Sequence, residues 1–135
     1  MNADRFFDTN VLVYAYSKED HRTAAARQLV FDGGVVGVQA LNEFASVARA
    51  KLGFTWAEVQ EAIDKIVILC PNPRPLGIET HLHALRLSRR YGFSIWDSLI
   101  VAAAAEARCT SLYTEDLKHG QIVDGVRIVN PFLAQ

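Results

Sequence analysis

The strongest constraint on the fold is an alternation of two hydrophobic periods along the 135-residue chain. Short runs of apolar and β-branched residues are followed by longer segments in which apolar residues recur every three or four positions. A buried strand followed by an amphipathic helix is the repeating unit of a parallel sheet with crossover helices. The pattern therefore predicts an α/β layer fold with a central, mainly parallel sheet.

The predicted strands are short, and the helices take up most of the chain. We expect strands at residues 4–7, 35–38 and 111–114, and helices at 10–16, 20–31, 39–52, 56–68, 78–91 and 94–108. The tail is ambiguous. Asp124 and Gly125 between two β-rich runs predict a hairpin over 121–129, whereas residues 126–129 alone suit an edge strand of the parallel sheet.

Length and composition favour a single domain over residues 1–135, because a chain of this size can bury enough surface to be stable without disulfides or structural metal. Cys70 and Cys109 lie far apart in the sequence. We therefore interpret them as two core thiols rather than as part of a disulfide framework or a zinc site. The N-terminus lacks the pattern of an export signal and no apolar run is long enough to cross a bilayer, so we expect a cytoplasmic protein without membrane contact.

Four acidic residues occupy positions where an acid is costly. Asp8 follows the first predicted strand and Asp116 follows the third. Both thus lie at carboxyl ends of strands, where open α/β sheets bind their ligands. Glu43 borders the apolar stripe of its helix, and Asp97 has apolar neighbours one and two turns further along its own helix. An ionised carboxylate on such a face requires compensation by charge or hydrogen bonds.

Each acid taken alone also has an ordinary structural explanation. Asp8 can cap the following helix, Glu43 can reach water from the border of its helix, and Asp116 suits a turn. Asp97 has capping-box spacing to Ser94. Taken together, however, four carboxylates directed toward one crevice repel one another, so the cluster implies a bound cation. Oxygen ligands without Cys or His favour Mg²⁺ or Mn²⁺ over zinc.

Four motifs in a fixed order carry a family resemblance. They are residues 7–12 (FDTNVL), 40–44 (ALNEF), 97–104 (DSLIVAAA) and 112–117 (LYTEDL). Over essentially the whole chain, this order resembles the PIN domain of VapC-type toxins. The resemblance implies a three-layer α/β/α fold and a Mg²⁺- or Mn²⁺-dependent endoribonuclease, the toxin of a type II toxin–antitoxin pair. It also implies a small antitoxin partner, an RNA substrate and a homodimer, and it favours the edge-strand interpretation of the tail.

The resemblance assigns roles to six residues, four catalytic and metal-binding acids with two supporting side chains: Asp8, Glu43, Asp97, Asp116, Thr114 and Asn10. We expect Asp8 and Asp97 to be direct metal ligands. Glu43 is expected to bind the metal or to position the attacking water. Asp116 is expected to act through a water, with its orientation fixed by Thr114 and with Asn10 as a neighbour. One departure from the family is Trp96, which we expect to shape the mouth of the site.

Basic residues provide candidate contacts to RNA phosphates. The formal net charge is −1, so the chain without its four clustered acids is mildly basic. Arg86, Arg89 and Arg90 share one face of a predicted helix, and Arg49 and Lys51 follow the helix of Glu43. A solvated helix surface is the alternative explanation for the arginine group.

Two other functions stay open at the level of the sequence. A haloacid-dehalogenase-type phosphotransferase also begins with a strand, Asp and Thr and uses Mg²⁺, but it requires a second acid two positions later, where this chain has Asn10. The other alternative is a non-catalytic module that holds a cation and binds a partner protein. RNA cleavage tested with and without Mg²⁺ separates this module from a nuclease.

Overall fold

The computed structural model describes residues 2–18 and 21–133, so the expected helix start at Asp20 lies outside the described residues. Six helices and four strands are present in this part of the chain. They are β1 (Arg5–Phe7), α1 (Thr9–Ala15), α2 (His21–Asp32), α3 (Val38–Ala50), α4 (Trp56–Leu69), α5 (Ile78–Tyr91), α6 (Ile95–Glu106), β2 (Ser111–Tyr113), β3 (Ile122–Val123) and β4 (Val126–Val129). The predicted helices are all found, with ends that differ by one or two residues.

The sheet is mainly parallel, as predicted, and has the order β1-β2-β4-β3. β2 pairs in parallel with β1 and with β4, while β3 pairs antiparallel with β4. Both interpretations of the tail are therefore partly right: the hairpin exists, and its second strand joins the parallel sheet. The edge strand is β3 and not β4. Asp124 and Gly125 both have positive φ, 48° and 80°, which suits the tight hairpin turn.

The predicted strand at 35–38 is wrong. Val35 forms a parallel bridge to Phe6, and Gly37 forms another to Arg74, but no ladder develops between them. Gly37 is already the N-cap residue of α3, so the chain turns away from β1 after two residues. Gly34 lies so close to β1 that an added Cβ would approach the Phe7 ring to 2.7 Å. This segment crosses β1 closely instead of extending the sheet.

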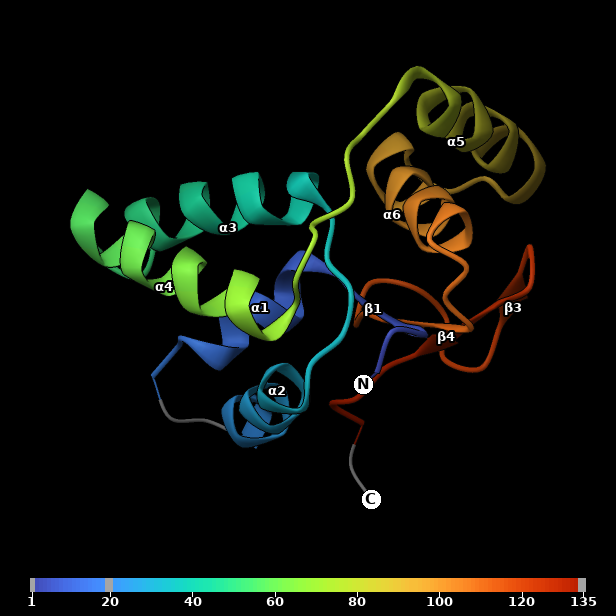
Figure 1. Cartoon of the computed structure of the whole chain (residues 1–135). Helices are drawn as coiled ribbons and strands as arrows, with labels where there is room; N and C mark the ends of the chain where they lie inside the picture. Colours follow the sequence, from blue (N-terminus) through green and yellow to red (C-terminus); the bar gives the residue numbers. More distant parts are fainter. Residues whose placement is uncertain (1, 19–20, 134–135) are drawn as a thin grey trace.

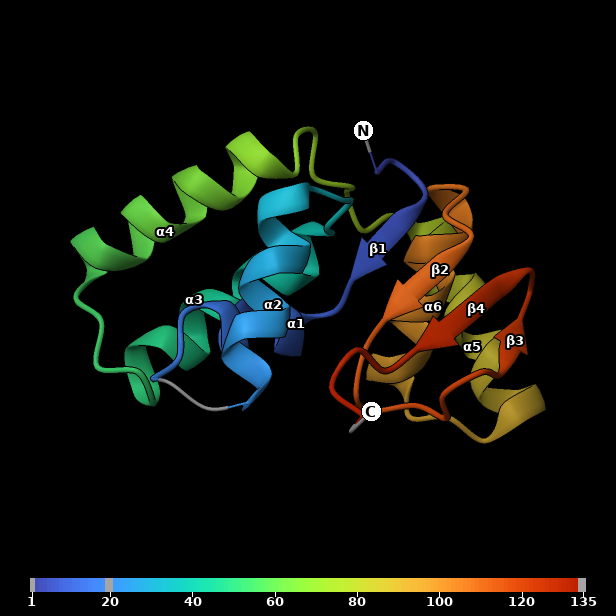
Figure 2. The same ribbon diagram turned by 90° about the horizontal axis from the view of Figure 1, so that it is seen from below.

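The sheet separates two hydrophobic clusters. Phe6 and Phe7 are consecutive in β1, so their side chains point to opposite faces. Phe7 packs with buried residues of α1 to α4, and Phe6 packs with α5, α6 and the other strands. Figures 1 and 2 show α1 to α4 on one side of the strands and the α5–α6 pair on the other. The predicted three-layer α/β/α architecture is confirmed.

The predictions for two helix ends and for the two cysteines are confirmed by this fold. Thr55 caps α4 in a capping box with Glu58, and Gly92 ends α5 with a φ of 77°. Cys70 and Cys109 are both buried and free. Among the described residues, no helix combines the length and the apolar character that a membrane span requires.

Candidate active site

Three of the four predicted acids line one pocket. Asp8, Glu43 and Asp116 surround a cavity of about 280 Å³, together with Asn10 and Lys51. Asp8 and Asp116 reach it from the carboxyl ends of β1 and β2, which are adjacent parallel strands. Glu43 reaches it from α3. The two strand-end acids thus meet at the carboxyl ends of parallel strands, the edge at which open α/β sheets generally bind ligands.

Asp8 is the most buried of these acids, with 6% of its surface exposed. It is the N-cap residue of α1, and its Oδ1 accepts a hydrogen bond of 2.7 Å from the backbone N–H of Thr9. Burial raises the pKa of Asp8 to about 6, an effect that hydrogen bonds from Thr114 and Thr9 oppose and that the charges of Asp116 and Glu43 increase. Asp8 is thus both the cap of α1 and a member of the acidic group in the pocket. The capping interpretation does not exclude the functional one.

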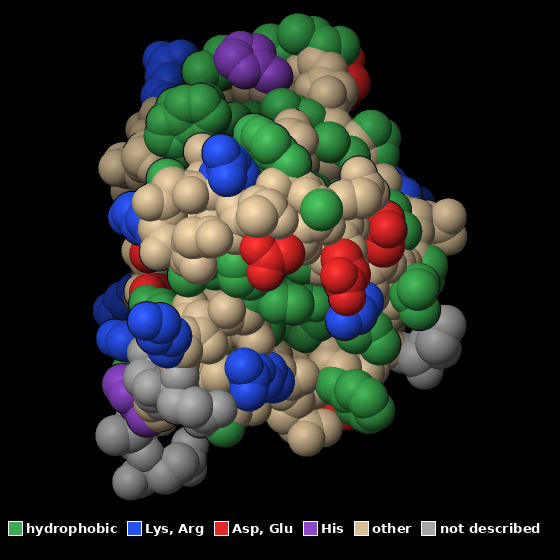
Figure 3. Space-filling view, turned by 90° about the vertical axis from the view of Figure 1, so that its left-hand side faces the viewer, with side chains coloured by type: hydrophobic (Ala, Val, Ile, Leu, Met, Phe, Trp, Pro, Cys, Tyr) green, Lys and Arg blue, Asp and Glu red, His purple; other side chains and the backbone are tan. Residues whose placement is uncertain are grey.

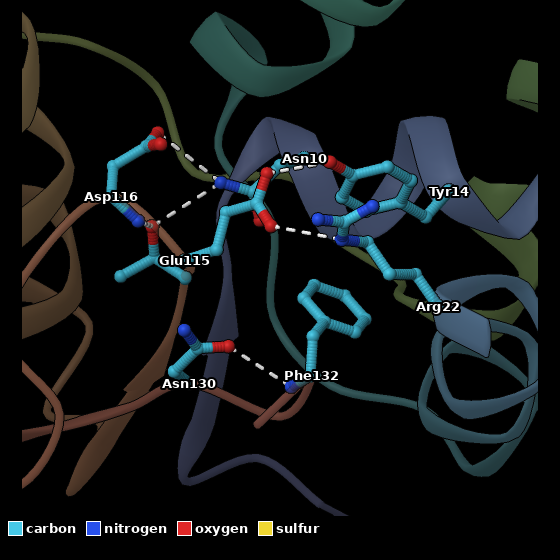
Figure 4. A network of polar contacts seen from close by, with 8 residues as sticks. Asn10, Tyr14, Arg22, Glu115, Asp116, Asn130 and Phe132 are labelled. Atoms are coloured by element: carbon cyan, nitrogen blue, oxygen red, sulfur yellow. Dashed lines mark hydrogen bonds and ion pairs between the residues drawn. The ribbon is translucent and has the colours of Figure 1, made fainter. Parts of the chain in front are cut away.

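The hydroxyl of Thr114 connects the two strand ends. It is fully buried and donates to Asp8 Oδ2 at 2.8 Å. It accepts from the backbone N–H of Asp116 at 3.1 Å and from Asn10 Nδ2 at 3.3 Å. Asn10 Nδ2 also donates to Asp116 Oδ2 at 3.2 Å, as Figure 4 shows. One hydroxyl with three partners has its full bonding capacity in use, so these four residues form a connected unit.

Asp116 is the more accessible of the two strand-end acids. Partial burial raises its pKa, as does the nearby charge of Asp97, and the hydrogen bond from Asn10 lowers it. Smaller increases come from Glu115 and Glu43. The carboxylates are therefore close enough to repel one another, which is the electrostatic situation that a cation relieves.

Glu43 is half-buried on α3 and is held at both oxygens. Thr9 Oγ1 donates to Oε2 at 2.8 Å, and Gln39 Nε2 donates to Oε1 at 3.1 Å. The first contact joins α3 to α1 directly beside Asp8. Glu43 therefore does more than reach water from the border of its helix, because its position is fixed relative to the strand-end acids.

Asp97 stands apart from this arrangement, because it does not line the pocket. Its backbone N–H donates to Ser94 Oγ at 3.1 Å, which is one half of the predicted capping box. The returning bond is absent, and no described residue donates to the Asp97 carboxylate. Trp96, beside it, has 64% of its surface exposed and also lies outside the pocket lining. Asp97 acts on the pocket through its charge, since it raises the pKa of Asp116.

The donor set fits Mg²⁺ or Mn²⁺. The pocket offers carboxylate oxygens, and the buried amide oxygen of Asn10 has no hydrogen-bond partner. Within residues 2–18 and 21–133, no three His, Cys, Asp or Glu side chains are grouped tightly enough to hold an ion by themselves. Mg²⁺ is commonly held by one or two carboxylates and keeps several waters, so it does not require such a group. Zinc favours Cys and His ligands, and neither residue type is present in the described lining of this pocket.

The predicted basic residues fall into two groups, one at the end of α3 and one on α5. Lys51 lines the pocket, whereas the guanidinium of Arg49 donates to the Phe54 carbonyl at 2.9 Å and stacks on Trp56. The other group comprises exposed residues of α5, none of which lines the pocket: Arg86, Arg89 and Arg90. On the face shown in Figure 3, acidic and basic side chains are interspersed with hydrophobic ones, without a broad patch of one sign.

Tyr14, Arg22 and Glu115 also belong to the surroundings of the site, and sequence reasoning missed them. Tyr14 lines the pocket, and its hydroxyl donates to Glu115 Oε1 at 2.6 Å. Arg22 Nε lies 3.4 Å from Glu115 Oε2. One signal was available: Tyr14 follows Asn10 by four residues, so the two share a helix face.

Comparison with known proteins agrees with this geometry. The model of the PIN domain family matches residues 5–124, so the chain belongs to the PIN domain family. No curated protein matches the sequence. A toxin–antitoxin complex from Klebsiella pneumoniae has a similar fold, with a TM-score of 0.71, 20% identity and coverage of 95% of this chain and 98% of that one.

Two further solved structures share the fold. VapC20 of Mycobacterium tuberculosis, a toxin that cleaves the sarcin–ricin loop, has a TM-score of 0.65 and 14% identity, with 83% of this chain and 91% of that chain covered. FitAcB of Neisseria gonorrhoeae has a TM-score of 0.65 and 15% identity, with 94% and 97% covered. VapC-type proteins are thus among the structural neighbours, as the motifs predicted.

Proposed function

We propose that this chain is a Mg²⁺- or Mn²⁺-dependent endoribonuclease and the toxin of a type II toxin–antitoxin pair, with residues 1–135 forming a single PIN domain. The observation that carries the proposal is the buried Asp8 carboxylate, which shares one pocket with Asp116 and Glu43 in a chain of the PIN domain family. A buried, like-charged group of this kind destabilises the fold unless it binds a cation.

Asp8, Asp116 and the Asn10 amide oxygen would hold the metal on the strand-end side of the pocket, and Asp97 would add its negative charge from α6. Once bound, a divalent ion lowers the pKa of its water and stabilises negative charge on phosphoryl oxygens. Thr114 fixes the orientation of Asp8 through the 2.8 Å hydrogen bond. Glu43, held by Thr9 and Gln39, is placed to orient a water or accept its proton.

Lys51 is the basic side chain that lines the pocket, and we assign it a contact with a substrate phosphate. Arg86, Arg89 and Arg90 would bind phosphates further along an RNA strand. Arg49 would support the same end of α3 by fixing the turn at Phe54. The similar toxin–antitoxin complex supports a small antitoxin partner for this chain.

Labelled RNA and the purified chain test the proposal. Cleavage is expected with Mg²⁺ or Mn²⁺, and it should be lost with excess EDTA and in Asp8→Ala. Cleavage that survives EDTA would overturn the metal dependence. A chain that binds Mn²⁺ without cutting RNA would instead be the non-catalytic cation-holding module.

Growth provides the test for the toxin role. Expression of the wild-type chain alone should arrest growth, and expression of Asp8→Ala at the same level should not. Harmless expression of an active wild-type nuclease would contradict the toxin assignment while leaving the ribonuclease assignment intact.

A further inference from the structure

Two consecutive acids of the loop after β2 are held in opposite directions. Asp116 is directed toward Asn10, and Glu115 is directed toward Tyr14 and Arg22, as Figure 4 shows. The two residues are adjacent in the bend that follows β2, so their side chains are carried by one short piece of backbone. Fixing one of them therefore restricts where the other can lie.

Both hydrogen bonds come from one helix. Asn10 and Tyr14 are one turn apart in α1 and share a face. Asn10 holds Asp116 at 3.2 Å, and Tyr14 holds Glu115 at 2.6 Å. Both bonds end on a carboxylate, and the Tyr14 bond is the shorter of the two. α1 thus fixes the loop at two successive residues.

Tyr14 is itself held in place by its neighbours. Its ring contacts Phe132 edge to face, with 5.1 Å between the ring centroids. The Arg22 guanidinium lies over the same ring, 5.0 Å from its centroid, while Arg22 Nε pairs with Glu115. Both members of the ion pair are only partly exposed, at 36% and 25% of their side-chain surfaces. The Tyr14 hydroxyl therefore meets Glu115 from a fixed direction.

We propose that Tyr14 is a positioning residue of the metal site: by holding Glu115, it sets the orientation of Asp116 in the pocket. The inference rests on the proposed metal-dependent function. Arg22 supports the same arrangement through its ion pair with Glu115. Neither residue is assigned contact with metal or substrate, so both act through Asp116.

Mn²⁺ binding to the full-length chain without RNA, measured by isothermal titration calorimetry, tests this role. Tyr14→Phe removes only the hydroxyl and should weaken Mn²⁺ affinity by about tenfold, the lower end of the range for residues that orient a metal ligand. Glu115→Ala should weaken it by a similar factor. The double variant should be no weaker than either single one, because both changes remove the same contact.

Glu115→Gln separates positioning from charge. The amide oxygen can still accept from Tyr14, so the affinity should stay within about twofold of wild type although a negative charge is gone. If Glu115→Gln loses as much affinity as Glu115→Ala, Glu115 acts as a charge and the proposal is overturned. Additive losses in the double variant would overturn it as well.

Two control variants test whether the loss of any ion pair or any tyrosine hydroxyl affects Mn²⁺ binding. Lys65→Gln breaks an exposed ion pair with Glu61 of the same 3.4 Å length, and Tyr91→Phe removes a hydroxyl from α5. Both should bind Mn²⁺ as wild type does. Variants whose thermal midpoint falls while Mn²⁺ affinity is unchanged would show a purely structural role. A wild-type chain that binds no Mn²⁺ would overturn the proposed function itself, whereas equal binding by wild type and Tyr14→Phe would overturn only the positioning role.

Discussion

The acid pocket beside α1 and the nearby carboxylate of α6, which lies outside the pocket lining, differ in how their carboxylates are held. On the α1 side, Asp8, Asn10, Thr114 and Asp116 are joined by hydrogen bonds, and Thr9 links this side to Glu43. On the α6 side, Asp97 contributes a carboxylate to which no described residue donates. The α1 side is therefore organised before any ligand arrives. The α6 side can be reoriented without breaking a hydrogen bond.

The largest expected effect is the difference in RNA cleavage between a variant of Asp8 on the α1 side and a variant of Asp97 on the α6 side. Asp8→Asn should reduce cleavage by at least about 100-fold, the usual size when a preorganised electrostatic group is lost. This loss should persist at higher Mn²⁺ concentrations. Asp97→Asn should reduce cleavage by only about tenfold. No hydrogen bond from a described residue fixes the Asp97 carboxylate, and an outer-sphere water can take its place. Cleavage rates measured across a Mn²⁺ titration give both fold-losses. If the two variants lose the same activity and added Mn²⁺ restores neither, the proposed difference between the two sides is wrong.

Thr114 tests whether the α1 side is a connected unit. Thr114→Val removes one donor and two acceptor contacts, so we expect the free energy of unfolding to fall by about 3 kcal/mol and cleavage to fall by about 10- to 100-fold. Thr114→Ser keeps the hydroxyl and should lose under about 1 kcal/mol. Urea unfolding with both variants checks this, and similar stabilities for Val and Ser would contradict the role of the hydroxyl.

The raised pKa of Asp8 predicts a pH dependence of stability in EDTA. Between about pH 4 and pH 6 the folded chain retains a proton on Asp8 that the unfolded chain releases, so unfolding becomes easier as the pH rises through this interval. Asp8→Asn lacks this loss and should be more stable than wild type at pH 7 by about 3 kcal/mol. The difference between the two proteins should approach zero below about pH 3. A constant difference would show that Asp8 titrates normally.

The smallest expected effects concern the RNA contacts assigned to basic residues, with Lys51 in the pocket lining and the arginines of α5 outside it. Lys51→Gln should reduce the slope of log affinity against log salt by about 0.7, the value of one phosphate contact on a single strand. The triple replacement of Arg86, Arg89 and Arg90 by Gln should reduce it by up to about 2. Metal affinity should be unchanged in both proteins. An unchanged slope in the triple variant would mean that the arginines only decorate a solvated face.

The sequence predicted the two sides unequally well. Asp8 and Asp116 were found because an acid directly after a buried strand is visible in the sequence, and the structure brings them to one pocket. The orientation of Asp97 was not predictable, since helical spacing gives the face of a residue but not the partners of its side chain. Glu115 was missed because its contacts depend on where α1 and α2 pack relative to β2.

The fold, too, was predicted well where the sequence signal is local and less well where it depends on how distant segments pack. Helices were predicted to within one or two residues because their periodicity and caps are local. The segment 35–38 was overpredicted as a strand because its apolar residues suit a sheet, whereas Gly34 before it and Gly37 within it let the chain cross β1 closely. The tail required knowledge of which strand β4 joins, and β4 pairs with β2 in addition to its hairpin partner β3.

The edges of the sheet limit how this protein can associate and aggregate. At one edge, the outward-facing backbone groups of β1 are already bonded, because Phe7 donates to Val35 and Val35 donates to Arg5. At the other edge, β3 offers only two residues. Neither edge of the described sheet is a long template for adding a foreign strand. Recruitment by strand addition is thus disfavoured, and a newly made chain without a partner is protected against the edge-to-edge stacking that begins fibril growth.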